Sequence, residues 1–160
     1  MQSEREPIVP VISSSVAGPL GITHLPRLWL KILLYAQGRL PEGYRHGAGG
    51  FDELLCDHIG IDGDAFVSFI ETAKPDYLET ERWVEANSKN LNPAAIAEFN
   101  ELIRTRNMRD EMAAERRERL GITDASCKNA IALNNLDDWA GMHAALTGAA
   151  HSAPKDGTPA

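Results

Sequence analysis

One segment, residues 21–36, limits what this chain can fold into more than any other. At about 100° per residue, its apolar side chains cover almost the whole circumference of a helix. Its polar strip is narrow and consists of His24, Arg27, Lys31 and Tyr35. A helix that is apolar nearly all round is normally buried. The sequence therefore predicts a central buried helix whose polar strip faces either a groove or a polar cavity.

The boundaries of this helix follow from its flanking residues. Thr23 is the expected N-cap, Pro26 lies in the first turn, and Gly38 ends the helix. Prolines and a run of serines precede it, which predicts an extended arm over residues 1–19. Residues 147–160 have no apolar period and are expected to be a disordered tail. The helical domain then covers residues 20–146.

The rest of the chain contains short apolar segments with helical spacing. Asn92 and Pro93 form a strong start signal, while Gly60, Pro75 and Gly121 mark ends. No stretch alternates with a period of two for long enough to predict a strand. The sequence predicts an all-α, compact single-domain bundle of about six or seven short helices.

Composition excludes several classes of function. The chain has 160 residues and a net charge of -7, which disfavours nucleic acid and anionic membrane surfaces as partners. The apolar run from Leu28 to Ala36 is interrupted by Lys31 and is too short to span a membrane. No signal peptide is apparent, and Cys56 and Cys127 match no metal or disulfide spacing. A cytoplasmic protein without a metal or cofactor is expected.

Two further segments are relevant to function. The loop from Gly43 to Gly50 is either a flexible turn or a source of backbone N–H groups for an anion. The charged segment 104–120 is expected to be a solvated helix in which Met108 and Met112 are among the few apolar positions.

The polar strip has a definite chemistry. Arg27 suits a carboxylate or phosphate, and Lys31 adds a point charge one turn later. Apolar surroundings lower the pKa of a lysine, which makes Lys31 a candidate base or Schiff-base nucleophile. His24 and Tyr35 are candidate proton donors or acceptors. Alternatively, Arg27 and Lys31 are structural. Their partners would then be the following carboxylates: Asp52, Asp57, Asp62 or Asp110.

Five segments together carry a resemblance. They are GITHLPRLWLK, FDELLCDHIGIDGDAF, the region of Trp83, NPAAIAEFN and the Arg109-Asp110 pair. In this order they resemble the small bacterial proteins grouped as domain of unknown function 5069. The resemblance implies a compact helical domain and no established activity. It also implies that Asn100, Arg109 and Asp110 are significant polar positions, and it places Leu30 where members usually have an acidic residue.

These observations define two hypotheses. The first is a cofactor-independent enzyme of the lyase, isomerase or cyclase type, or a binding protein, for an anionic small organic molecule. Its candidate catalytic residues are Lys31, His24 and Tyr35, and its candidate substrate-binding residues are Arg27, Asn100 and Arg109. The second is a helical interaction module that docks a protein partner or a second copy of itself, forming a homodimer, through its acidic surface or an exposed face formed by Met108 and Met112.

Overall fold

A computed structural model describes residues 5–151, and seven α-helices lie within that range. The prediction of an all-α fold is confirmed. The predicted tail, residues 147–160, lies mostly outside the described residues. The helices are α1 (Leu25–Ala36), α2 (Gly50–Ile59), α3 (Gly63–Ala73), α4 (Tyr77–Asn87), α5 (Pro93–Thr105), α6 (Asp110–Leu120) and α7 (Ala130–Thr147).

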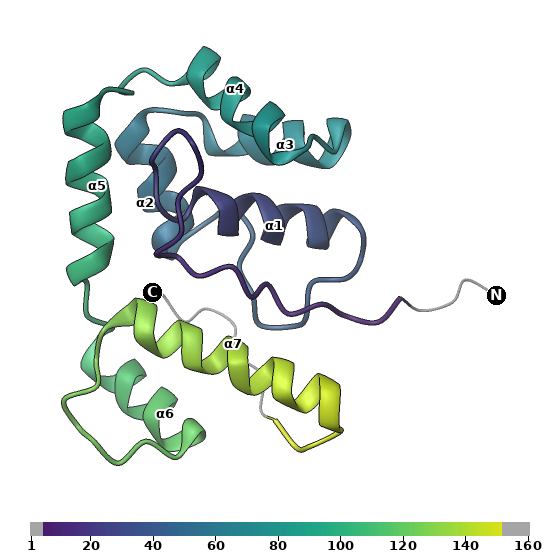
Figure 1. The fold of residues 1–160 in the computed structure, drawn as a ribbon, viewed down its shortest axis with the longest axis vertical. Coiled ribbons are helices and arrows are strands. Elements are labelled where there is room, and N and C mark those ends of the chain that lie inside the picture. Colours follow the sequence, from purple (N-terminus) through teal and green to yellow (C-terminus); the bar gives the residue numbers. More distant parts are fainter. Residues whose placement is uncertain (1–4, 152–160) are drawn as a thin grey trace.

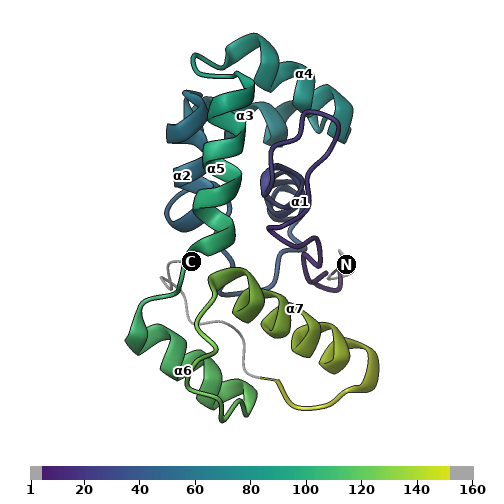
Figure 2. The same ribbon diagram turned by 60° about the vertical axis from the view of Figure 1, so that its left-hand side comes forward.

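Helix α1 is the centre of the arrangement (Figure 1). Helices α3 and α4 pack on one side of α1, and α2 packs against both α3 and α5. Helices α6 and α7 pair with each other at the other end of the molecule, and α5 leads into this pair (Figure 2). The N-terminal arm returns along α1, where Ile8 N donates to Arg39 O over 2.8 Å. In the described part of the chain, no helix is long and apolar enough to cross a membrane.

The core confirms that α1 is buried. Leu25, Leu28 and Ile32 are fully buried and pack with Phe66 and Phe99 from other helices. Burial of each such side chain contributes about 1.5–3 kcal/mol relative to exposure. These contacts fix the rotation of α1, and so they determine where its polar strip points.

The start of α1 differs from the prediction. The N-cap is His24 and not Thr23. The backbone N–H and the hydroxyl of Thr23 both donate to Asn100 Oδ1, over 2.9 and 2.8 Å, and these bonds hold the Thr23 side chain at α5. His24 has a φ of 69°, which is an uncommon conformation for a residue with a side chain. Such strain persists only where the surroundings hold the residue in place.

The charged segment also differs from the prediction. It is not one helix, because α5 ends at Thr105 and α6 begins at Asp110. Between them, Met108 N donates to Lys128 O over 2.8 Å, and the Met108 side chain is only 2% exposed. The predicted exposed face of Met108 and Met112 is therefore wrong, since the break between the helices turns Met108 into the core.

Candidate functional site

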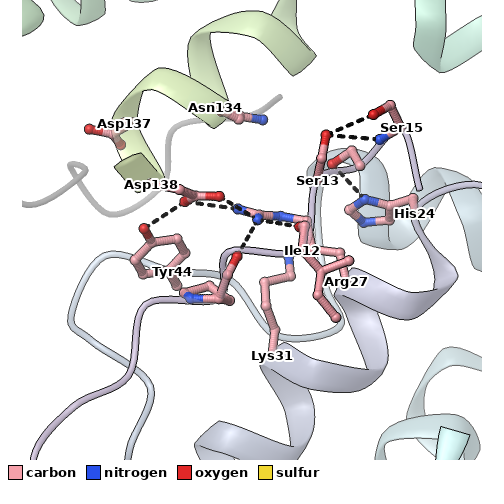
Figure 3. A network of polar contacts seen from close by, with 12 residues as sticks. Ile12, Ser13, Ser15, His24, Arg27, Lys31, Tyr44, Asn134, Asp137 and Asp138 are labelled. Atoms are coloured by element: carbon pink, nitrogen blue, oxygen red, sulfur yellow. Dashed lines mark hydrogen bonds and ion pairs between the residues drawn. The ribbon is translucent and has the colours of Figure 1, made fainter. Parts of the chain in front are cut away.

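A small pocket lies beside the polar strip of α1, between the N-terminal arm, the glycine-rich loop, the start of α2, and helices α6 and α7. Its volume is about 70 Å³. Segments far apart in the sequence form its walls (Figure 3). The lining residues are Ser14, His24, Arg27, Lys31, Gly43, Tyr44, Arg45, Gly49, Gly50, Phe51, Asp52, Arg116, Asn134, Asp137 and Asp138.

The structure brings three of the four strip residues to this pocket. His24, Arg27 and Lys31 lie on one face of α1 and are 2%, 5% and 6% exposed. Tyr35 does not line the pocket. It is half-exposed at the end of α1 and stacks on His46, with 3.6 Å between the ring centroids. The predicted strip is thus divided into a buried part and a surface part.

Arg27 joins three segments of the chain. Its guanidinium donates to both carboxylate oxygens of Asp138 on α7, over 2.6 and 3.3 Å. It also donates to the backbone carbonyls of Pro10 and Ile12 in the arm, over 2.6 and 2.8 Å. Tyr44 from the glycine-rich loop donates to Asp138 Oδ1 over 2.8 Å (Figure 3). Burial, together with the charge of Asp138, raises the pKa of Tyr44, so this phenol remains a donor.

The ammonium group of Lys31 forms a buried ion pair with Asp52 at the start of α2. Lys31 Nζ lies 2.7 and 2.8 Å from the two oxygens of Asp52, and Gly47 N also donates to this carboxylate. Burial by itself would raise the pKa of Asp52. The charge of Lys31 and the hydrogen bond from His24 outweigh burial and hold that pKa well below its usual range. Burial lowers the pKa of Lys31, and the charge of Asp52 opposes this.

The sequence left open whether Arg27 and Lys31 pair inside the protein, and the structure answers this. Asp52 was among the expected partners, whereas Asp138 was not. Leu30 stands where family members usually have an acidic residue before the lysine. The counter-charge of Lys31 is instead Asp52 on α2, 21 positions further along the chain.

The hydrogen bonds of His24 define its proton position. Burial lowers the pKa of His24 from 6.5 to about 4, so the ring is neutral at pH 7. His24 Nε2 lies 2.7 Å from Asp52 Oδ1, and an ionised carboxylate only accepts hydrogen bonds. Nε2 therefore carries the proton and Nδ1 has the lone pair. Since Ser14 Oγ lies 2.9 Å from Nδ1, the Ser14 hydroxyl donates to the ring.

In addition to the ion pairs of Arg27 and Lys31, the pocket wall formed by α6 and α7 contains a cluster of charged side chains. Arg116 is 4% exposed, donates to Asn134 Oδ1 over 2.9 Å, and lies 3.6 Å from Asp137. Arg119 lies 2.6 Å from the same carboxylate. The sequence did not predict this wall. Arg116 lies in a segment rich in charged residues, and no local pattern indicates that the carboxylates of Asp137 and Asp138 are buried.

The glycine-rich loop places one cation without a protein partner at the pocket. The Arg45 guanidinium lines the pocket and forms no hydrogen bond or ion pair with the described residues. Arg45 packs over Gly49, where a Cβ atom would lie 2.3 Å from Nη1. Gly49 is the N-cap of α2 and has a φ of 74°. The loop therefore holds Arg45 against the positive end of α2.

The other two predicted substrate-binding residues lie away from the pocket. Asn100 bridges two backbone segments: Oδ1 accepts from Thr23, and Nδ2 donates to Gly21 O over 2.8 Å. Arg109 is exposed just before α6, and its guanidinium lies 3.2 Å from the sulfur of Met112. Neither residue lines the pocket.

Fold and site together define a small helical protein with a buried, charge-rich pocket. The chain belongs to the family described as domain of unknown function (DUF5069), whose sequence profile matches residues 11–137. The match includes Arg27, Lys31 and Asp52, and it ends one residue before Asp138. A search of curated proteins finds no match for the chain.

Proposed function

We propose that this pocket binds a small organic anion, with Arg45 and the N-terminus of α2 as the anion-binding groups. The observation that carries the proposal is the Arg45 guanidinium, which lines the pocket and forms no hydrogen bond or ion pair with the described residues. The first N–H groups of a helix have no partner within the helix, and they favour negative charge. Asp52 and Glu53 lie in this first turn. Lys31 compensates the charge of Asp52, and the side chain of Glu53 is exposed to solvent.

The charge balance of the pocket supports an anionic ligand. Four cationic side chains line it: Arg27, Lys31, Arg45 and Arg116. Three carboxylates oppose them: Asp52, Asp137 and Asp138. Because His24 is neutral, the lining has one excess positive charge in a protein of net charge -7. A local positive site on an acidic protein selects small anions over large polyanions, which the remaining surface repels.

The size of the pocket limits the bound group. A volume of about 70 Å³ has room for a few heavy atoms, since one water molecule occupies about 30 Å³ in the liquid. A carboxylate or phosphate group is of this size. The remainder of a larger ligand extends past Gly43 and Tyr44, which are partly exposed at the pocket.

Within this proposal, the protein is a cofactor-independent enzyme in which His24 is the proton acceptor. Nδ1 of the neutral ring accepts from the Ser14 hydroxyl, which also lines the pocket, so a proton from the ligand reaches Nδ1 through this hydroxyl, while Asp52 fixes the orientation of the ring. Lys31 is less suited to this role, because both oxygens of Asp52 engage its ammonium group. The lyase, isomerase and cyclase reactions expected from the sequence would all use His24 in this way.

A thermal-shift screen of anionic metabolites at constant ionic strength tests the binding proposal. We expect at least one carboxylate or phosphate compound to raise the Tm of the wild type, and Arg45→Ala to remove this increase. Arg109→Ala is the matched control, because it deletes an exposed guanidinium outside the pocket. The proposal would be contradicted if an anion stabilised all three proteins equally. It would also be contradicted if no anion raised the Tm of any of them.

Variants of Arg27 and Lys31 are less useful for this test. Each forms a buried ion pair, and removal of one partner leaves a buried carboxylate without its counter-charge, at a cost of about 3–5 kcal/mol. A loss of binding in such variants would not be separable from a loss of folding. Arg45 is only partly buried, so its removal leaves the core unchanged.

The second candidate function is an interaction module that docks a protein or a second copy of the chain. With Met108 buried, the observation that favours it is on α7, where Trp139 and Leu146 are 57% and 79% exposed. They are seven positions apart and thus share one face of the helix. Light scattering of wild-type protein and Trp139→Ser tests self-association: a dimer in the wild type that dissociates in the variant would support this function.

A further inference from the structure

Three consecutive serines in the N-terminal arm have different environments. Ser13 and Ser15 bond to each other through their hydroxyls, over 2.9 Å. Ser14 is 2% exposed and is directed instead to His24, where its Oγ lies 2.9 Å from Nδ1. The arm is held in this position because Arg27 binds the carbonyls of Pro10 and Ile12. The structure thus selects one of three chemically identical hydroxyls and places it at the pocket.

Ser14, His24 and Asp52 form a hydroxyl, imidazole and carboxylate relay. The two connecting distances are 2.9 and 2.7 Å, and all three residues line the pocket. In this arrangement the imidazole accepts the proton of the hydroxyl, and the carboxylate fixes the tautomer and stabilises the imidazolium. Here the hydroxyl is on Nδ1 and the carboxylate on Nε2. The relay works in this orientation because Asp52 leaves the lone pair on Nδ1.

We propose that Ser14 is a nucleophile activated by His24, and that the protein hydrolyses small esters whose acyl or alcohol part carries negative charge. The charge preference rests on the proposed function, whereas the nucleophile rests on the relay alone. The strained backbone of His24 agrees with this role, since its φ of 69° holds the ring between Ser14 and Asp52.

The reaction needs only water as a co-reactant. Ser14 Oγ forms a bond to the ester carbonyl carbon as its proton passes to His24 Nδ1, and an electron pair moves to the carbonyl oxygen. When this intermediate collapses, the bond to the alcohol oxygen breaks and His24 returns the proton to that oxygen. Water then attacks the acyl carbon, giving a proton to His24. The bond to Ser14 Oγ breaks, and Oγ regains the proton.

The same pocket contains groups that can stabilise the negative oxygen of the intermediate. Such stabilisation requires fixed donors in a site with little water. Arg45 and the backbone N–H groups of Gly50 and Phe51, at the start of α2, belong to segments that line this pocket. Its volume of about 70 Å³ favours short acyl groups.

Reaction with p-nitrophenyl acetate tests the proposal, because this ester is uncharged and its acyl group is small. For wild-type protein we expect a burst of one equivalent of p-nitrophenol, and an acetyl group on Ser14 by peptide mass spectrometry after acid quenching. Ser14→Ala should abolish the burst, and His24→Gln should slow acylation by at least about 100-fold, the usual size of general-base effects. Ser13→Ala and Ser15→Ala are the matched controls and should react like the wild type.

Two results would overturn the proposal: no acetyl group on Ser14 of folded wild-type protein, or an unchanged burst in folded Ser14→Ala. If Ser14→Ala does not fold, Ser14→Cys decides the question. This variant keeps a nucleophile at position 14. Acetylation at this position supports the proposal, and a folded variant that is not acetylated there contradicts it. Stabilisation by phosphate, measured on the same wild-type protein, separates the two proposals. If Ser14 is acylated but phosphate does not stabilise the protein, only the anion site is overturned. If phosphate stabilises the protein but Ser14 is not acylated, only the nucleophile is overturned.

Discussion

Asp52 and Asp138 determine how the buried cations of α1 are compensated. Each lies on a different helix from its partner, and each engages that partner through both carboxylate oxygens. Buried ion pairs contribute little net stability, because desolvation offsets the attraction between the charges. Loss of one member is costly all the same. The two pairs join α1 to α7 and to α2.

Asp138→Asn should lower the free energy of unfolding by about 3 kcal/mol, because it leaves the buried guanidinium of Arg27 without a counter-charge. Urea denaturation measures this change. The control is Glu101→Gln, whose partner is Arg104 in an exposed pair, and we expect it to leave the free energy of unfolding nearly unchanged. Equal costs for the two variants would show that the Arg27 pair is not buried as described.

His24 makes stability depend on pH. Its pKa is about 4 in the folded protein and near 6.5 when unfolded, so between these values only the unfolded chain binds the proton. Stability is thus complete above pH 6.5 and falls as pH decreases to about 4, by about 1.4 kcal/mol per pH unit. Chemical denaturation of wild type and His24→Gln at pH 7, 6 and 5 measures this. The variant should lack this slope, and the same slope in both proteins would exclude His24 as its source.

The charged groups around His24 come from two elements. Lys31 and Arg27 are on its own helix, Asp52 is on α2, and Ser14 in the arm is its uncharged partner. Asp52, whose pKa is held below the usual range in the folded protein, adds its own loss of stability only as the pH falls below about 5, where the carboxyl of the unfolded chain begins to bind a proton. The dependence between about pH 5 and 6.5 is therefore assigned to the imidazole.

At the scale of elements, the glycine-rich loop and α2 act together. Gly49 has φ 74° and ψ 165°, a backbone conformation that is nearly restricted to glycine, and it contacts Arg45. Gly49→Ala should lower stability by about 1–3 kcal/mol and weaken stabilisation by phosphate, since Arg45 must move. Gly121→Ala is the control: its φ is 73° and the space around it is open. We expect Gly121→Ala to reduce stability with no effect on phosphate binding, as measured by thermal shift, and the same outcome for Gly49→Ala would contradict this role of Arg45.

The elements also show how far the sequence predicts this structure. The apolar period predicted the burial of α1 and the position of its polar strip, because both depend on residues close in sequence. Thr23 and Met108 were predicted wrongly, since tertiary contacts with Asn100 and Lys128 override the local signals. The partners from α7 were not predictable, because which helix faces α1 depends on packing of the whole chain.

At the scale of the whole molecule, the arm, the glycine-rich loop and α7 converge on one side of α1. Three contacts of Arg27 and Tyr44 join these segments, and the pocket lies where they meet. The site is therefore a product of the complete fold, although α1 supplies its central residues. Of the six candidate site residues from the sequence, His24, Arg27 and Lys31 line the pocket, and their functional roles remain predictions.

A titration with inorganic phosphate at constant ionic strength, followed by ¹H–¹⁵N NMR, tests the anion site most directly. We predict saturable shifts of the amide signals of Gly49, Gly50 and Phe51 in the wild type and in Arg109→Ala, with no saturation in Arg45→Ala. Saturation of these amides that persists in Arg45→Ala, or its absence from the wild type, would contradict the account of this pocket as an anion site.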